Sequence, residues 1–454
     1  MNFPSTLLRL NDIPRMSRPT FVAERNHMFL FGIFAGIIEG NTSAIVVSKT
    51  FEGSYALITA VWITPMIANV LTLLWGVLLR GRPRQRVFQW LIFGAVASFL
   101  SIALTPADWR PWGGWIFFLQ IAAARIFLVG VLTVRTSMWG MNYPKSDRAR
   151  ITARLQSLRF TVGLFATAGI ARLFDQDAGL YRWLYPLVGV IGILSVIPVR
   201  QMRVRGEARE LRRHLAESAR LEATTGKSLG LVHSFRECLQ ILKRDAAFSR
   251  YCTAMFFLGA SNFMIEPIVL IIATQQLGYS YLMSSFMLDL FPNIIMLASM
   301  PMSARYFDRV GVLPFRVVNS AVWLVGAVAA AVGAVLVQAG WLVWLGVGLL
   351  WASRFVNGFG RGGGAIAWNL GHLHFAGRDN ADLYLGIHVT LTGLRGLVMP
   401  VIAIYLFKWI GGWSLAIAVL LGIIAVELFR RLQAFAEPKM AAERAATETS
   451  VAAS

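Results

Sequence analysis

The sequence predicts an all-α polytopic membrane protein, with twelve transmembrane helices arranged as two six-helix parallel repeats. Three observations support this fold class: the composition is apolar, long apolar runs recur, and the two halves share a residue pattern. The chain has 454 residues, of which 56% are hydrophobic and 15% are charged, and its mean hydropathy is +0.60. A soluble domain carries roughly 25% charged residues. The composition therefore indicates a chain that faces lipid.

Long apolar runs define the predicted membrane spans. A helix that crosses the hydrocarbon core needs about 20 mostly apolar residues. Such runs occur on both sides of one large polar segment, six on each side. An even number of spans lets both halves enter the membrane in the same direction. The predicted spans are 28–48, 54–80, 87–104, 114–137, 155–174, 183–199, 250–274, 280–303, 313–337, 341–364, 383–407 and 412–430.

Composition changes along the chain divide it into five parts. The central polar segment mixes both charges with leucines on one helical face around Arg205–Glu222, which predicts an amphipathic helix on the membrane surface. The C-terminal end is rich in Ala, Glu, Thr and Ser, which predicts disorder. The parts are a cytoplasmic tail (1–27), an N-terminal six-helix bundle (28–199), a cytoplasmic linker (200–247), a C-terminal six-helix bundle (248–431) and a disordered cytoplasmic tail (432–454).

The formal net charge of +20 is distributed unevenly across the predicted loops. Lys and Arg are sparse in the alternate loops on one side and crowd the other side. This positive-inside pattern places both termini and the linker in the cytoplasm, with the chain in the inner or plasma membrane. The basic charge thus indicates topology and excludes a nucleic-acid footprint. The basic residues on the sparse side are Lys49, Arg110, Arg172, Arg182 and Lys408.

The two halves also share residues at a constant offset. Gly32 and Glu39 in the first span correspond to Gly259 and Glu266 in the seventh span, 227 residues later. Such matches in equivalent elements indicate an internal repeat. Three further pairs follow, at offsets of 227 or 229 residues: Pro65 with Pro292, Arg82 with Arg309, and Arg125 with Arg354.

Two sequence motifs carry a family resemblance. The loop after the eighth span reads Ala304-Arg-Tyr-Phe-Asp308-Arg309-Val-Gly311. It resembles the Gly-x-x-x-Asp-Arg-x-Gly motif of the major facilitator superfamily, with Ala304 in place of the first glycine. The tenth span reads Arg354-Phe-Val-Asn357-Gly358-Phe-Gly360, which is similar to that family's Arg-x-x-x-Gly-x-Gly motif. The equivalent loop of the first half, from Gly76 to Arg84, lacks the aspartate.

The resemblance implies a cavity lined by spans one, four, seven and ten that opens alternately to each side. It also implies that Arg80, Arg82, Asp308 and Arg309 act as cytoplasmic gates. The alternative is an ordinary surface ion pair in a turn, worth ~0–1 kcal/mol.

Four charged residues lie inside the spans that the resemblance assigns to the cavity. Each charge costs roughly 2.5–3.5 kcal/mol to insert, so each needs a partner or a function. We expect Glu39 to pair with Arg125, and Glu266 to pair with Arg354. Two interpretations stay open: structural salt bridges within each bundle, or a site where a carboxylate exchanges a proton while arginines attract an anion. A helix-weakening residue follows each acid, Gly40 or Pro267.

The second half contains more polar residues at membrane depth than the first. Asp289 precedes Pro292 and is a further candidate proton site, and Asn357 lies in the motif of span ten. In span eleven, His388, Thr392 and Arg395 fall on one helical face, either toward a cavity or in contact with another helix. The candidate substrate and coupling residues are therefore Glu39, Arg125, Glu266, Asp289, Arg354, Asn357, His388 and Arg395.

These patterns favour a secondary active transporter, coupled to protons, for a small organic solute, with anionic solutes among the candidates. An exporter or facilitator of amphipathic compounds is the first alternative, and a transporter-like receptor or assembly factor is the second. We expect that the chain is not an enzyme, since the predicted spans contain no pair of a nucleophile and a general base. We expect no metal and no cofactor either. The expected partners are the solute, protons and lipid, with the chain as a monomer.

Overall fold

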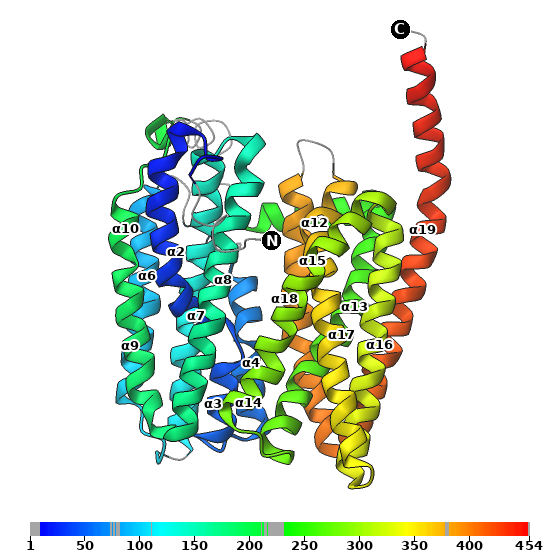
Figure 1. Cartoon of the computed structure of the whole chain (residues 1–454). Helices are drawn as coiled ribbons and strands as arrows, with labels where there is room; N and C mark the ends of the chain where they lie inside the picture. The colour runs from blue at the N-terminus through cyan, green and yellow to red at the C-terminus, as the bar shows by residue number, and fades with distance from the viewer. Residues whose placement is uncertain are drawn as a thin grey trace. The chain divides into compact units, whose positions relative to one another are not determined.

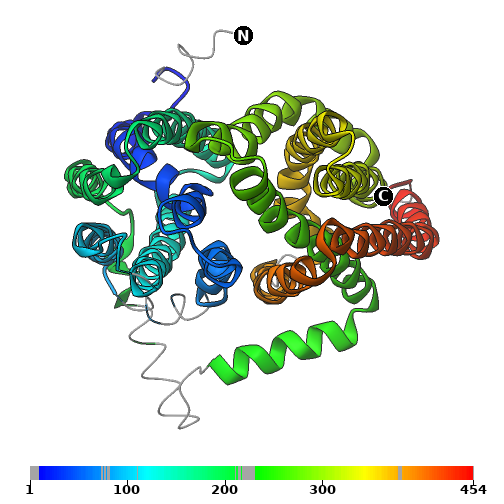
Figure 2. The same cartoon turned by 90° about the horizontal axis from the view of Figure 1, so that it is seen from below.

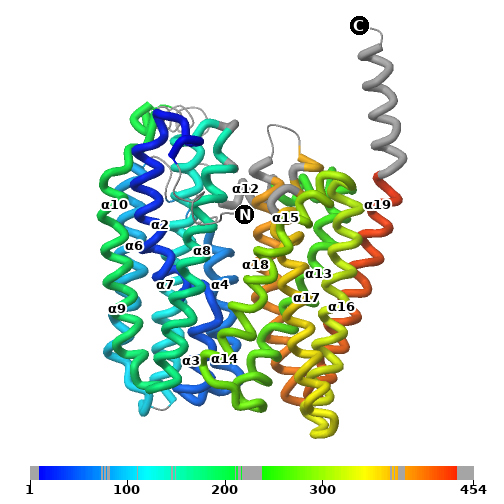
Figure 3. Tube along the Cα trace, viewed as in Figure 1, coloured from blue at the N-terminus to red at the C-terminus, as the bar shows by residue number. Residues whose placement is uncertain are grey.

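The computed structural model describes residues 10–72, 75, 78, 82–109, 111–209, 211–212, 216, 231–376 and 381–452. These residues are mostly helical, and no strand occurs among them. The chain divides into two compact units. Unit 1 contains Met1–His233 and Gly278–Phe286, and unit 2 contains Ser234–Leu277 and Met287–Ser454. Within each unit the long helices run side by side (Figures 1 and 3).

Unit 1 is a bundle of long helices joined by short turns. A Cβ on Gly36 would lie 2.7 Å from the Cα of Gly163, so the backbones of α2 and α8 touch at this point. This close approach brings the middle of α8 next to the end of α2. The elements are η1 (Arg15–Ser17), α2 (Arg18–Glu39), α3 (Thr42–Lys49), α4 (Tyr55–Val70), α6 (Arg84–Ser101), η2 (Ile102–Leu104), α7 (Trp112–Asn142), α8 (Lys145–Gln176), η3 (Ala178–Leu180), α9 (Tyr181–Leu194), α10 (Val196–Arg200) and the short α14 (Tyr281–Ser285).

Unit 2 repeats the bundle plan, and two π-helical turns interrupt its helices. A Cβ on Gly358 would collide with the carbonyl oxygen of Pro292, so α17 and α15 pack at backbone distance. Figure 2 shows α12 lying across the direction of the long helices. The elements are α12 (Leu231–Arg244), α13 (Ala246–Ile271), the π-turn η4 (Ile272–Gln276), the π-turn η5 (Phe286–Leu290), α15 (Phe291–Val310), α16 (Val312–Ala339), α17 (Val343–Leu370), η6 (Gly371–His374), α18 (Ala381–Ile410), η7 (Gly411–Ser414) and α19 (Leu415–Ala452).

The described helices overlap every predicted span. By length and apolarity, nine helical segments among the described residues could cross a membrane, and Tyr384–Ala436 counts as one segment although it runs through α18 and α19. The chain is therefore a multi-pass helical membrane protein. The count of twelve spans stays a prediction.

Three boundaries differ from the sequence prediction. The first long helix begins at Arg18, inside the segment predicted as a tail, and it ends at Glu39. The last helix continues to Ala452, over residues where a disordered tail is predicted. Most of the predicted amphipathic segment Arg205–Glu222 lies outside the described residues.

The glycine that closes the loop motif, Gly311, has φ +79°, a conformation that favours glycine.

Candidate functional site

A cluster of charged and polar side chains surrounds Glu266 of α13. One carboxylate oxygen lies 2.9 Å from Arg354, and the other lies 3.1 Å from Arg361 and accepts a hydrogen bond of 3.0 Å from the Asn357 amide. The expected pairing of Glu266 with Arg354 is therefore present. The side chain of Glu266 is only 9% exposed. A buried carboxylate needs such partners because the charge would otherwise be left without solvation.

All three partners of Glu266 come from α17. Arg354, Asn357 and Arg361 stand at i, i+3 and i+7, so they share one helical face. Their exposure differs: the Arg354 side chain is 1% exposed and that of Arg361 is 31% exposed. Among the described residues, Asn357 Oδ1 and Arg354 Nε have no hydrogen-bond partner although they are buried. The cluster therefore keeps unused acceptor and donor capacity in an apolar setting.

The equivalent acid of unit 1, Glu39, has a different partner from the one expected. The structure pairs Glu39 with Arg159 of α8, whose Nη1 lies 2.7 Å from one carboxylate oxygen and 2.6 Å from the other. The predicted pair with Arg125 is replaced because the close contact of α2 and α8 brings Arg159 to the carboxylate. The Glu39 side chain is 29% exposed, which is more than for Glu266.

Arg125 of α7 donates hydrogen bonds to the backbone near Glu39 and to α4. It donates to the carbonyl oxygens of Ile38 at 2.7 Å and Gly40 at 3.0 Å, on either side of the helix end at Glu39. It also donates to the Val61 carbonyl at 2.9 Å and to the Thr64 hydroxyl at 2.5 Å. One arginine thus joins the end of α2 to α4.

A difference in helix continuity explains why the two repeats use equivalent arginines differently. In unit 1 the helix stops at Glu39 and its C-cap Gly40 is extended, so carbonyl groups lose their helical partners. Arg125 satisfies two of these carbonyls. In unit 2 the helix α13 continues past Pro267 to Ile271, and the equivalent Arg354 binds the carboxylate of Glu266. The sequence predicted a weakened helix after both acids. The structure shows a helix end after Glu39, whereas the helix that contains Glu266 continues.

The polar face predicted on α18 is present, and it contacts a neighbouring helix. Thr392 Oγ1 donates to the His388 carbonyl at 2.9 Å, and Arg395 donates to Thr392 Oγ1 at 3.0 Å. Arg395 also donates to the carbonyl of Met255 on α13. A Cβ on Gly259 would collide with the Arg395 guanidinium, so this glycine makes the contact possible. Arg395 therefore joins α18 to α13 in unit 2, and Thr392 links its guanidinium to the His388 carbonyl within α18.

The remaining candidates are Asp289 and the four loop residues to which the resemblance assigns a gating role. Asp289 is buried in the π-turn η5, just before α15. Arg82 is exposed, and so are Asp308 and Arg309 at the end of α15. Arg80 lies outside the described residues. The gating role that the family resemblance implies for these four loop residues stays a prediction.

Sequence reasoning missed a set of contacts in unit 1 that involves a segment from far along the chain. The Asp175 carboxylate accepts hydrogen bonds from the backbone amides of Tyr281 at 2.5 Å and Leu282 at 3.2 Å, the first turn of α14. Lys49 donates to the Tyr279 carbonyl at 2.8 Å. The segment Gly278–Phe286, which connects α13 to α15 in the chain, is therefore held by charged residues of unit 1.

Sequence reasoning also missed several buried polar residues. Arg159, Arg316 and Arg361 lie within predicted spans but are not among the predicted site residues. In unit 2, Arg316 is buried and donates to the Tyr251 hydroxyl at 2.9 Å. In unit 1, His27 is buried and its Nε2 lies 3.0 Å from Arg135. A search for every charged residue inside each predicted span would have found the arginines.

Comparison with known proteins identifies the family. The model of the Major Facilitator Superfamily matches residues 28–351, which is more than half of the chain. The chain belongs to the major facilitator superfamily. Residues 28–351 include the whole N-terminal repeat and Glu266 of the second repeat. No curated protein matches the sequence.

Solved structures of superfamily members share this fold at low sequence identity. A mutant of the nucleoside transporter NupG has a TM-score of 0.64 and 13% identity, covering 91% of this chain and 99% of that chain. The xylose transporter XylE from E. coli, in an inward open conformation, has a TM-score of 0.64 and 13% identity, covering 91% and 95%. A POT family transporter in complex with 5-aminolevulinic acid has a TM-score of 0.59 and 12% identity, covering 94% and 96%. These structures show the fold, and the family match indicates a transporter of this superfamily rather than an enzyme.

Proposed function

We propose that the chain is a secondary active transporter that works by alternating access and couples a small organic anion to protons. The observation that carries the proposal is that a single carboxylate, Glu266, is shared by two arginines, Arg354 and Arg361. These three groups together carry one excess positive charge. An unbalanced charge at membrane depth costs roughly 2.5–3.5 kcal/mol. An anionic group on the solute would balance it.

The two arginines have different exposures, which supports different roles for them. Arg354 is almost completely buried and contacts Glu266, so its role is to hold the carboxylate. Arg361 keeps 31% of its side chain exposed, so a solute can reach it. A carboxylate or phosphate is the group that a guanidinium binds best, because both can form two parallel hydrogen bonds with it.

Competition for Arg361 would couple the solute to a proton. When the solute anion binds Arg361, Glu266 loses one of its two cationic neighbours. Loss of a positive neighbour in a dry site favours the neutral carboxyl form, so Glu266 takes up a proton. Release of the solute returns Arg361 to Glu266 and releases the proton. In unit 1, Glu39 forms an ion pair with Arg159.

The proposal includes a topology and a gate. The charge distribution supports a chain in the inner or plasma membrane with both termini in the cytoplasm. We propose that the chain acts as a monomer. The contacts of Asp175 with α14 support a gate on the side opposite the cytoplasm, since the turn after α13 lies there in this topology. The gate opens when α14 leaves Asp175.

Proteoliposomes with a trapped pH-sensitive dye test this function. The probes are nucleosides, xylose and 5-aminolevulinic acid, the compounds associated with the similar transporters, together with small mono- and dicarboxylates. We expect an anionic probe to cause a change in internal pH that empty liposomes do not show. Uptake of a radiolabelled probe without any proton movement would overturn coupling and favour a facilitator. Specific binding without uptake would favour a receptor.

The variant Arg361→Gln tests the role of the exposed arginine. We expect the KM for the anionic solute to rise about tenfold or more, because one charge-assisted contact is lost. The matched control is Arg431→Gln on α19, whose arginine pairs with Glu427 at an exposed position. An unchanged KM in the Arg361→Gln variant would show that this arginine does not contact the solute.

A further inference from the structure

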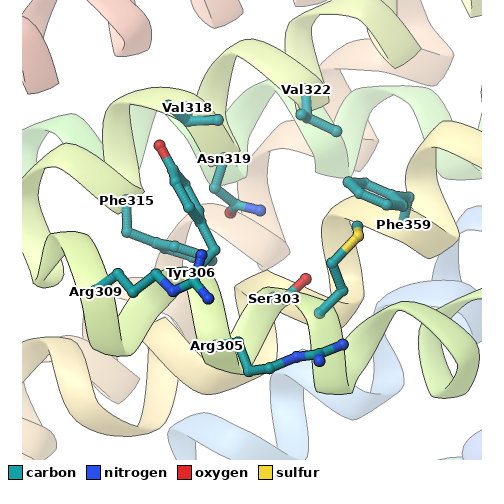
Figure 4. Close-up of a pocket in the computed structure, with 10 residues that line it drawn as sticks. Ser303, Arg305, Tyr306, Arg309, Phe315, Val318, Asn319, Val322 and Phe359 are labelled. Atoms are coloured by element: carbon teal, nitrogen blue, oxygen red, sulfur yellow. The ribbon is translucent and has the colours of Figure 1, made fainter.

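We infer a second binding site, separate from the proposed transport site: a surface pocket of unit 2 that binds the phosphate headgroup of a membrane phospholipid. The pocket has a volume of about 510 Å³ and is formed by α15, α16 and α17. None of its lining residues belongs to the Glu266 cluster. Figure 4 shows that the pocket has a basic edge and an apolar edge.

The basic edge comes from the last turns of α15. Arg305 and Arg309 stand four residues apart, on the same helical face, and both are exposed. No carboxylate among the described residues forms a salt bridge with either guanidinium. Asp308 precedes Arg309 in the sequence but does not line the pocket. Two unpaired guanidinium groups on one edge are suited to a phosphate, which accepts several charge-assisted hydrogen bonds.

Polar groups inside the pocket add hydrogen-bonding capacity. Asn319 is buried and uses its amide nitrogen to donate to the Gly360 carbonyl at 3.1 Å. Within the described part of the chain, its Oδ1 has no hydrogen-bond partner. Figure 4 shows Asn319 between the arginine edge and the valine edge. This oxygen accepts a hydrogen bond, so it is suited to a hydroxyl or ammonium group of a phospholipid headgroup.

The opposite edge is apolar and suited to the upper part of an acyl chain. Val318 and Val322 lie along it on α16, and Phe359 closes it on α17 (Figure 4). Met302 and Val318 are 49% and 44% exposed, so this edge opens on the surface of unit 2. From Val312, where α16 begins, to Val322 the helix rises roughly 15 Å at about 1.5 Å per residue.

This combination fits a phospholipid better than free phosphate. The arginines end a membrane-spanning helix, where headgroups meet water, and the apolar edge extends toward the hydrocarbon core. Basic pockets between transmembrane helices bind anionic lipid headgroups, and each basic residue near the surface contributes to the affinity. A free phosphate would use only the basic edge and would leave the apolar edge empty.

Lipid binding to the purified full-length chain in detergent tests the inference. Native mass spectrometry would count adducts of dioleoylphosphatidylglycerol on the wild type and on the double variant Arg305→Gln/Arg309→Gln. We expect binding to weaken about tenfold or more in the double variant, because two cationic contacts are lost. The control is Arg430→Gln/Arg431→Gln, which removes two exposed positive charges from α19. Equal weakening in both double variants would overturn the site, since general charge would explain it.

Two further experiments distinguish a bound lipid from a bound phosphate ion. Val318→Trp fills the apolar edge at an exposed position and leaves both arginines in place. We expect this variant to bind the lipid less tightly than the wild type. Inorganic phosphate, added at millimolar concentration, is expected not to displace the lipid. Displacement by phosphate together with unchanged lipid binding by Val318→Trp would overturn the assignment to a phospholipid.

Discussion

The substitution Glu266→Gln changes one atom of a buried cluster and has a predictable effect on stability. It leaves Arg354 and Arg361 facing a neutral amide, while a carbonyl oxygen remains to accept from Asn357. Removal of one partner from a buried ion pair costs about 3–5 kcal/mol. Because the amide keeps one hydrogen bond and Arg361 is partly exposed, we expect a value near the lower end, about 3 kcal/mol.

The matched control for this substitution is Glu39→Gln in the other repeat. Glu39 has a single arginine partner and a side chain that is 29% exposed, so part of its hydration is retained. We expect a cost of about 1 kcal/mol for this change. Thermal unfolding of the two purified variants in the same detergent, followed by intrinsic tryptophan fluorescence, measures the difference. Glu266→Gln should unfold at a clearly lower temperature than Glu39→Gln.

A double variant separates charge imbalance from simple loss of packing. Glu266→Gln/Arg361→Gln removes one charge of each sign and restores the original net charge of the cluster. We expect the double variant to be more stable than Glu266→Gln alone, since residues in one salt-bridge network couple by about 0.5–3 kcal/mol. The reasoning is refuted if the double variant is no more stable than the single one, or if both acids cost the same.

Two further predictions follow from the contacts of unit 1. Arg125→Met should destabilise the chain by about 2 kcal/mol or more, because the buried carbonyl of Ile38 and the partly buried carbonyl of Gly40 lose their donor; thermal unfolding checks this, and an unchanged midpoint would contradict it. Asp175→Asn should weaken the hold on α14 and increase hydrogen exchange at the amide of Tyr281 by roughly tenfold, since a charge-assisted bond contributes about 1.5–3 kcal/mol; exchange at the wild-type rate would show that the carboxylate does not hold this turn.

The sequence was sufficient to predict the membrane class, the repeat and the positions of most helices. Apolar runs of fixed length and a constant offset between halves are long-range patterns that local irregularities do not disturb. Glu266 and Arg354 were paired correctly because both lie inside spans that the resemblance assigns to one cavity. The predicted partner of Glu39 was wrong. The sequence does not show that the glycines at 36 and 163 bring α8 to α2, which places Arg159 at the carboxylate.

The helix end after Glu39 shows another limit of sequence reasoning. The sequence places a glycine after one acid and a proline after the other, and both residues weaken a helix. Only the glycine ends its helix in the structure, while α13 continues past Pro267. Whether a helix ends at such a residue depends on whether neighbouring side chains bind the carbonyls that lose their helical partners. Arg125 binds these carbonyls in unit 1. That arrangement depends on tertiary packing rather than on local sequence.

Proton-driven accumulation, compared with solute exchange, tests the coupling role of Glu266 most directly. Proteoliposomes that contain the Glu266→Gln variant would be given a pH gradient, and in a second experiment the same solute on both sides without a gradient. The proposal predicts that the variant loses accumulation driven by the gradient and keeps exchange of labelled for unlabelled solute, because binding to Arg361 remains. Accumulation at the wild-type level by the variant would contradict the proposal that Glu266 carries the coupled proton.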